Sequence, residues 1–67
     1  MPSVSSRDLC ALLERKGFEL KRQKGGHCVY FNSKQKRLTV VPMHSGDMKP
    51  GTVRAVLKQA GLSSKDL

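Results

Sequence analysis

The sequence is poor in acidic and aromatic residues and has no long apolar run, and each shortage excludes a class of protein. Its 67 residues include 5 Asp and Glu, 2 Phe, 1 Tyr and no Trp. The longest apolar run, residues 9–13, is far shorter than the roughly 20 residues that cross a bilayer. No charged start followed by an apolar stretch opens the chain, so we expect neither a secretory signal nor a membrane partner.

The small size of the chain sets a second limit. A chain of this length predicts a single domain over residues 1–67, which buries only about 60% of its unfolded surface. A doubly wound nucleotide-binding fold or a barrel does not fit, and there is no room for a deep pocket. We therefore expect no cofactor.

Cysteine is also scarce. Cys10 and Cys28 form neither a disulfide scaffold nor a Cys-x-x-Cys metal motif, and each lies in an apolar stretch typical of a small buried residue. Together with the missing signal, this usage favours a reducing compartment and a cytoplasmic protein.

Positive charge is abundant by contrast, and it is concentrated. The chain has 13 Lys and Arg and a formal charge of +8. Residues 15–37, here called the basic block, hold eight basic residues and one acidic residue, whereas the other 44 residues carry a net charge of +1. The block exceeds what solubility requires and predicts a polyanionic partner, with nucleic acid favoured over membrane because the block is not an amphipathic helix.

Apolar periodicity predicts two helices, one at each end of the chain. Leucines at i, i+3 and i+4 spacing indicate a helix over residues 6–16, capped by Ser5 and ended by Gly17. A second apolar stripe predicts a helix that Thr52 caps. It ends at Gly61 in a Schellman motif.

Between the helices the apolar period changes to two. Residues 18–23, 27–31 and 37–41 are expected to be strands, with a type I′ turn at Gly25-Gly26 and a polar turn over 32–36. The order α-β-β-β-α, with one antiparallel sheet and both helices on one face, matches a double-stranded RNA-binding domain, an α+β fold. A fold alone does not give a function.

The two histidines are the residues suited to proton transfer. His27 follows the glycine pair and lies near Arg22 and Lys24, where a bound RNA would present a 2′-OH and a phosphate. His44 lies in the loop after the third strand and is a possible accessory residue. Strand alternation places His27 with Val29 on one face and Cys28 on the other, and either face can be the core.

Other chemistries are weakly supported. A metal site from His27, His44, Cys10 and Cys28 would need residues that point to opposite sheet faces, and no metal-ligand spacing recurs, so we expect no metal. A Cys-His nucleophilic pair is disfavoured because the cysteines are expected to be buried. The basic block contains no pair of acidic residues.

Several motifs resemble one family, the HicA (YcfA-like) toxins of type II toxin–antitoxin systems. They are the leading helix over residues 6–18, the Arg-Gln-Lys-Gly-Gly-His hairpin at 22–27, the proline-x-histidine stretch at 40–44 and the closing helix at 51–63. The resemblance implies an mRNA interferase with a double-stranded RNA-binding-like fold. It also implies a HicB antitoxin that masks the active site. The catalytic histidine of the family maps onto His27 and its second histidine onto His44, while Gly26 replaces a serine.

These observations lead to a first hypothesis, a metal-independent endoribonuclease in which His27 is the general acid and base. Arg22 and Lys24 would hold phosphate, and further cations would widen the RNA surface: Lys21, Lys34, Lys36 and Arg37. The alternative is a non-catalytic RNA-binding module, and a weaker third interpretation is a basic surface for an acidic partner protein. Because the few aromatic residues are expected in or near the core, we predict little sequence preference.

Overall fold

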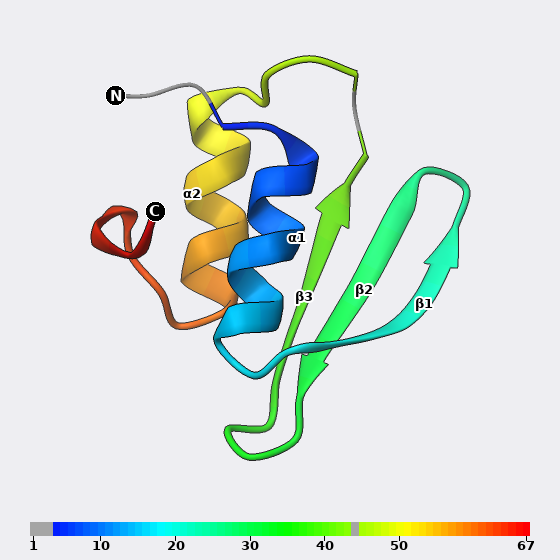
Figure 1. The fold of residues 1–67 in the computed structure, drawn as a ribbon, viewed down its shortest axis with the longest axis vertical. Coiled ribbons are helices and arrows are strands. Elements are labelled where there is room, and N and C mark those ends of the chain that lie inside the picture. The colour runs from blue at the N-terminus through cyan, green and yellow to red at the C-terminus, as the bar shows by residue number, and fades with distance from the viewer. Residues whose placement is uncertain (1–3, 44) are drawn as a thin grey trace.

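The computed structural model describes residues 4–43 and 45–67 and has two layers (Figure 1). Two helices lie side by side on one face of a three-stranded antiparallel sheet with the order β1-β2-β3. The α-β-β-β-α order is the double-stranded RNA-binding-like fold expected from the sequence, and that prediction is confirmed. The elements are α1 (Ser6–Arg15), β1 (Glu19–Lys24), β2 (His27–Asn32), β3 (Arg37–Pro42), α2 (Pro50–Gln59) and a short 3-10 helix, η1 (Ser64–Asp66).

Helix α1 begins and ends where its local signals predict. The Ser5 hydroxyl accepts from the Asp8 N–H at 3.1 Å, and the Ser5 N–H donates to the Asp8 carboxylate at 3.0 Å, which forms a complete capping box. At the other end Gly17 has a φ of 91°, and the Phe18 N–H donates to the Leu13 carbonyl at 2.9 Å. This Schellman motif turns the chain out of the helix and into β1.

Helix α2 begins earlier than expected. Its N-cap is Lys49 and Pro50 is its first residue, so the prediction that Thr52 caps the helix is wrong. Proline fits the first helical position because its φ is already helical and its missing N–H would have no partner there. The C-terminal prediction is confirmed, since Gly61 has a φ of 72° and the Leu62 N–H donates to the Leu57 carbonyl at 2.8 Å.

The strands depart from simple alternation at two places. A bulge at Lys21 shifts the pairing of β1 with β2 between Leu20 and Arg22. Strand β3 includes Pro42, at which it was expected to stop, because β3 is an edge strand and a proline there removes no necessary hydrogen bond. The glycine turn matches its prediction, since Gly25 and Gly26 have φ angles of 56° and 79°.

The core lies between the helices and the covered face of the sheet. Leu9, Leu13 and Val41 have no exposed surface, and Thr39 is equally buried. The Thr39 hydroxyl lies 2.9 Å from the Gln59 Oε1 atom and 3.3 Å from a carbonyl of α2, so the one fully buried polar side chain of β3 is satisfied. Among the described residues no helix is long and apolar enough to span a membrane.

The C-terminal segment packs back onto the first helix. Lys16, at the end of α1, forms an ion pair with Asp66 of η1, with 3.3 Å between Nζ and Oδ1. Ser63 caps η1 by accepting from the Lys65 N–H at 3.3 Å. The chain therefore closes on the helical layer, and the opposite face of the sheet carries no covering element among residues 4–43 and 45–67 (Figure 1).

Candidate nucleic-acid interface

The structure resolves which face of β2 is the core. Cys28 and Tyr30 are buried against the helices, whereas His27 is exposed and Val29 and Phe31 are partly buried. His27 therefore lies on the open face of the sheet. The sequence did not decide this, because the two alternating sets are similarly apolar.

The bulge at Lys21 brings Arg22 to the same face as His27. Arg22 pairs with Val29, and Lys24 pairs with His27, and directly paired residues share a face. Without the extra residue, Lys21 would oppose Val29 and Arg22 would face the helices. Arg22, Lys24, His27 and Val29 line a shallow depression of about 350 Å³, and the first three are here called the hairpin cluster.

The hydrogen bonding of the His27 ring suits it to act as a base. Its Nδ1 atom lies 3.2 Å from the Gly25 carbonyl oxygen. A carbonyl can only accept, so this contact selects the tautomer that carries hydrogen on Nδ1 and leaves the lone pair on Nε2. The turn that supplies the carbonyl is tied to the residue that follows β3, since the Met43 N–H donates to the Gly26 carbonyl at 2.7 Å.

A serine at position 26, which the resemblance implies for the family, would meet a backbone constraint in this hairpin. Gly26 has a φ of 79°, which side-chain-bearing residues rarely adopt, although apart from its two chain neighbours no described residue has an atom within 4 Å of a Cβ placed there. Glycine at position 26 thus avoids the backbone strain that a side chain would bring to this turn.

Three of the expected RNA-binding residues lie at the other end of the sheet. Arg37 pairs with Asn32, the last residue of β2, whereas His27 is the first. Five steps along a strand separate the two ends by about 16 Å. Lys34 and Lys36 lie in the turn before Arg37, and these three residues are here called the turn cluster.

Arg37 also has a structural environment of its own. Its Nε and Cζ atoms lie 2.8 Å from the position that a Cβ on Gly61 would occupy, so the side chain rests on the end of α2. Lys21 forms an exposed ion pair with Glu19, with 3.6 Å between Nζ and Oε2. The structure therefore separates five basic residues of the block into two clusters, and Arg15, Lys16 and Lys21 belong to neither.

The remaining candidate chemistry is limited. His44 lies outside the described residues, and within residues 4–43 and 45–67 no group of three or more His, Cys, Asp or Glu is arranged to hold a metal ion. Burial raises the pKa of the Cys28 thiol, and the neighbouring Cys10 raises it further. Cys28 is thus buried as expected and disfavoured as a nucleophile, because the thiolate is the reactive form.

Tyr30 is also withdrawn from the open face. Its hydroxyl donates to Glu14 Oε2 at 3.0 Å, and burial, followed by contacts with Cys10 and Glu14, raises its pKa well above the ordinary value. Tyr30 stays protonated at neutral pH and joins β2 to α1.

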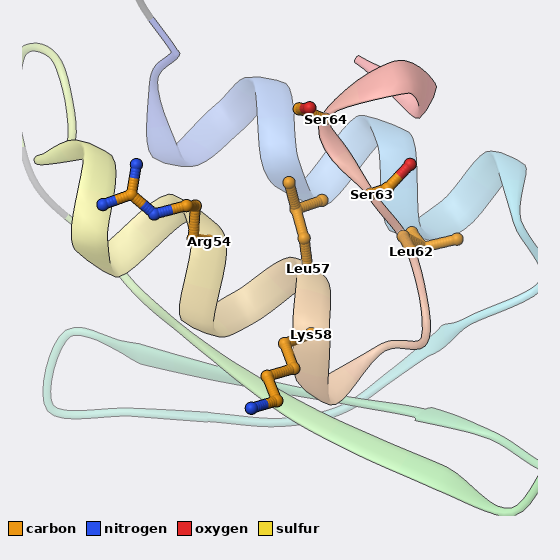
Figure 2. A pocket seen from close by; sticks show the side chains of 6 residues that line it. All are labelled: Arg54, Leu57, Lys58, Leu62, Ser63 and Ser64. Carbon is orange, nitrogen blue, oxygen red and sulfur yellow. The ribbon is translucent and has the colours of Figure 1, made fainter.

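A second and larger hollow lies on the helical side. It has a volume of about 470 Å³ and is formed by α2 and the segment that follows it (Figure 2). Its lining residues are Arg54, Leu57, Lys58, Leu62, Ser63 and Ser64. These side chains include no group that exchanges protons readily near neutral pH, so the hairpin cluster is the better candidate for chemistry.

One feature of the open face was missed by the sequence interpretation. Val29, Phe31, Leu38 and Val40 form an apolar strip there, and Leu38 is 54% exposed. In residues 37–41, Leu38 and Val40 alternate with Thr39 and Val41, so the sequence places them on one face of the strand. Which face is open could not be assigned without the pairing of β2 with β3.

Fold and site together define a class: a small basic α+β domain of the double-stranded RNA-binding-like type with a histidine on its open sheet face. The family model described as the HicA toxin of bacterial toxin–antitoxin systems matches residues 6–62. The chain therefore belongs to the HicA toxin family, which makes it a toxin with a cognate antitoxin as its partner. Among the curated proteins compared with it, none matches significantly.

Proposed function

We propose that this toxin is an endoribonuclease that cleaves mRNA and so inhibits translation and growth. The observation that carries the proposal is the placement of His27 beside Arg22 and Lys24 on the open face. Cleavage of an RNA phosphodiester is promoted by proton transfer and by cations that stabilise the charge on the phosphate, and these residue types can supply both.

The substrate supplies its own nucleophile in this reaction. His27 Nε2 takes the proton of a 2′-OH, whose oxygen then bonds to the adjacent phosphorus. The bond from phosphorus to the 5′-oxygen breaks, which leaves a 2′,3′-cyclic phosphate and a 5′-OH. Arg22 and Lys24 stabilise the extra negative charge that the phosphoryl oxygens carry in the transition state. His44, a lysine or water supplies the proton for the leaving 5′-oxygen.

The partners follow from the same surface. We propose a HicB-type antitoxin that covers the hairpin cluster and thereby blocks access of mRNA in the cytoplasm. The exposed cations of the cluster would attract acidic side chains as they attract phosphate. Antitoxin binding and RNA cleavage would then be mutually exclusive.

The test is cleavage of labelled RNA by the purified protein and by a His27→Ala variant. We expect discrete products from the parent, with cyclic phosphate ends, and a cleavage rate at least about a hundredfold lower for the variant. Because His27 is exposed, the variant should keep the thermal midpoint of the parent, which serves as the folding control. Cleavage by His27→Ala at the parental rate would contradict the assignment.

A non-catalytic RNA-binding module is the second candidate. It is favoured by the fact that the hairpin cluster contains a single histidine. RNA that is bound and blocked for translation but never cut by the parent protein would support this module over the enzyme.

A further inference from the structure

The open face combines an apolar strip with the cationic hairpin cluster. Val29 pairs with Val40, and Phe31 pairs with Leu38, so four apolar side chains lie next to one another across β2 and β3. Three of them are partly buried by their neighbours and Leu38 is more than half exposed. Among the described residues, no helix covers this strip (Figure 1).

The strip begins where the hairpin cluster ends. Along β2 the open-face residues are His27, Val29 and Phe31 in succession, and Arg22 lies directly across from Val29. A ligand that follows β2 would therefore meet cations and the histidine first and apolar side chains next. This order of side chains complements an RNA strand, in which a charged phosphate is followed by an apolar base.

We propose that the open sheet face binds single-stranded RNA, with the scissile phosphate at the hairpin cluster and a neighbouring base stacked on Phe31. The inference rests on the proposed function and adds the substrate form and a positioning residue. Four steps along the strand separate Phe31 from His27, a distance of about 13 Å. Phe31 thus contacts a base close to the cut without touching the reacting atoms.

Single-stranded RNA fits this face better than a duplex does. A duplex keeps the faces of its bases stacked inside and presents phosphates, sugars and base edges, so it offers the apolar strip no base face to contact. Unstacked bases can lie on an aromatic ring, which contributes about 1–3 kcal/mol per base, equivalent to about fivefold to a hundredfold in affinity.

A protein partner on the strip alone is less well supported. A stable interface buries about 800 Å² on each partner, several times what four partly covered side chains can contribute. The charged side chains of the hairpin cluster are all basic and complement the RNA backbone, and one carboxylate, that of Glu19, lies beside the strip where Glu19 pairs with Phe31.

This placement changes the expectation about the aromatic residues. Phe18 and Tyr30 are core residues, each 3% exposed, as the sequence suggested. Phe31 is only partly buried and lies on the face that carries His27. Because any base can stack on an aromatic ring, a contact with Phe31 adds affinity but little sequence preference.

The experiment measures RNA affinity in a His27→Ala background, which binds without cutting. A labelled single-stranded oligonucleotide is titrated with this variant and with His27→Ala/Phe31→Ala. We expect the second substitution to weaken binding about fivefold to a hundredfold. His27→Ala/Phe31→Tyr, which keeps the ring, should bind like the single variant.

Leu20→Ala in the same background is the matched control. Leu20 is 45% exposed, but it pairs with Tyr30 and so lies on the face of the sheet that the helices cover. We expect its removal to leave RNA affinity unchanged. Circular dichroism on each variant reports whether the fold is retained.

An oligonucleotide series with one abasic position provides the sharper readout. One abasic position near the cleavage point should lower the RNA affinity of the protein that keeps Phe31. The protein that keeps Phe31 and the Phe31→Ala variant should then bind the abasic RNA with equal affinity. Equal affinity of the two proteins for intact single strands, or duplex binding as tight as single-strand binding, would overturn the inference. So would a Phe31→Ala variant that loses antitoxin affinity while keeping RNA affinity.

The outcomes separate this inference from the proposed function. If the parent protein never cuts RNA but binds it through Phe31, the ribonuclease proposal fails and the stacking surface stands. If the parent cuts RNA and Phe31→Ala changes neither affinity nor KM, the stacking surface fails and the ribonuclease stands.

Discussion

The two faces of the sheet are built from the same kinds of residues but have different roles. Tyr30 and Val41 pack against the helices and are 3% and 0% exposed. Their immediate neighbours, Phe31 and Val40, are equally apolar and remain on the open face. The comparison shows that an apolar strand residue in so small a domain is not automatically a core residue, because the chain has only enough helix to cover one face.

The two ends of the open sheet extend the comparison. Both ends are basic, but only the hairpin end combines its cations with a histidine, whereas Arg37 of the turn end rests on α2. Charge alone therefore does not locate the site.

The largest effect is expected when charge is removed from one end at a time. The double variant Arg22→Ala/Lys24→Ala should weaken RNA binding by about tenfold to a hundredfold and reduce the salt slope of log K by about 1.4, because two phosphate contacts are lost. Lys34→Ala/Lys36→Ala removes the same charge at the other end and should change affinity much less. Equal losses in the two variants, measured by fluorescence anisotropy at several salt concentrations, would remove the distinction between the ends.

The two faces can be compared with a matched pair of substitutions. Val41→Ala should destabilise the protein by about 2 kcal/mol because it leaves a cavity in the core, and lower the thermal midpoint by roughly 10 °C. Val40→Ala deletes the same atoms from the open face and should cost less than about 1 kcal/mol. Thermal and urea unfolding measure both, and a larger loss for Val40 would mean that the open face is covered in solution.

A smaller effect tests the end of α2. Gly61→Ala should destabilise the protein by about 1 kcal/mol, since alanine is strained at a φ of 72°. Arg37 can swing away from the new methyl group because the crowded atoms belong to the outer part of its side chain. Urea unfolding should therefore give nearly the same loss in an Arg37→Ala background, and full rescue by Arg37→Ala would show that the clash dominates.

The smallest effect concerns acid stability in the helical layer. Hydrogen bonds from the Ser5 backbone and hydroxyl lower the pKa of Asp8, and those from the Ser63 backbone and from Lys16 lower the pKa of Asp66. A carboxyl whose pKa is lower in the folded state stabilises the fold above its unfolded value of 3.8, and this contribution is lost as the pH falls through the folded pKa. Thermal midpoints from about pH 6 to about pH 2 should fall less steeply in Asp8→Asn than in the parent.

The features that the sequence predicted correctly have short-range causes. The Ser5 helix cap, the Gly17 and Gly61 helix ends and the paired glycines of the hairpin each depend on a few neighbouring residues. The α+β class follows from the succession of predicted helices and strands. A three-stranded sheet and two helices with apolar faces bury those faces together when both helices pack on one side of the sheet.

The features that were missed depend on pairing between strands. The bulge at Lys21 contains no glycine to mark it, yet it decides that Arg22 faces the same side as His27. The face of β2 that is buried depends on which side the helices occupy. The position of Arg37 depends on strand pairing too, because its pairing with Asn32 places it on the helical side of the sheet. Hence His27 and its proximity to Arg22 and Lys24 could be predicted from the sequence, while the face of the sheet on which they lie could not.

The most direct test of the account is to map RNA onto the two faces by nuclear magnetic resonance. His27→Ala protein with labelled methyl groups would be titrated with a single-stranded oligonucleotide. We predict that the methyl signals of Val29, Leu38 and Val40 shift on binding while those of Leu9 and Val53, in the core beneath the helices, stay in place. Largest shifts at residues of α1 and α2, with the three open-face residues unmoved, would contradict the claim that the open face of the sheet is the RNA-binding face.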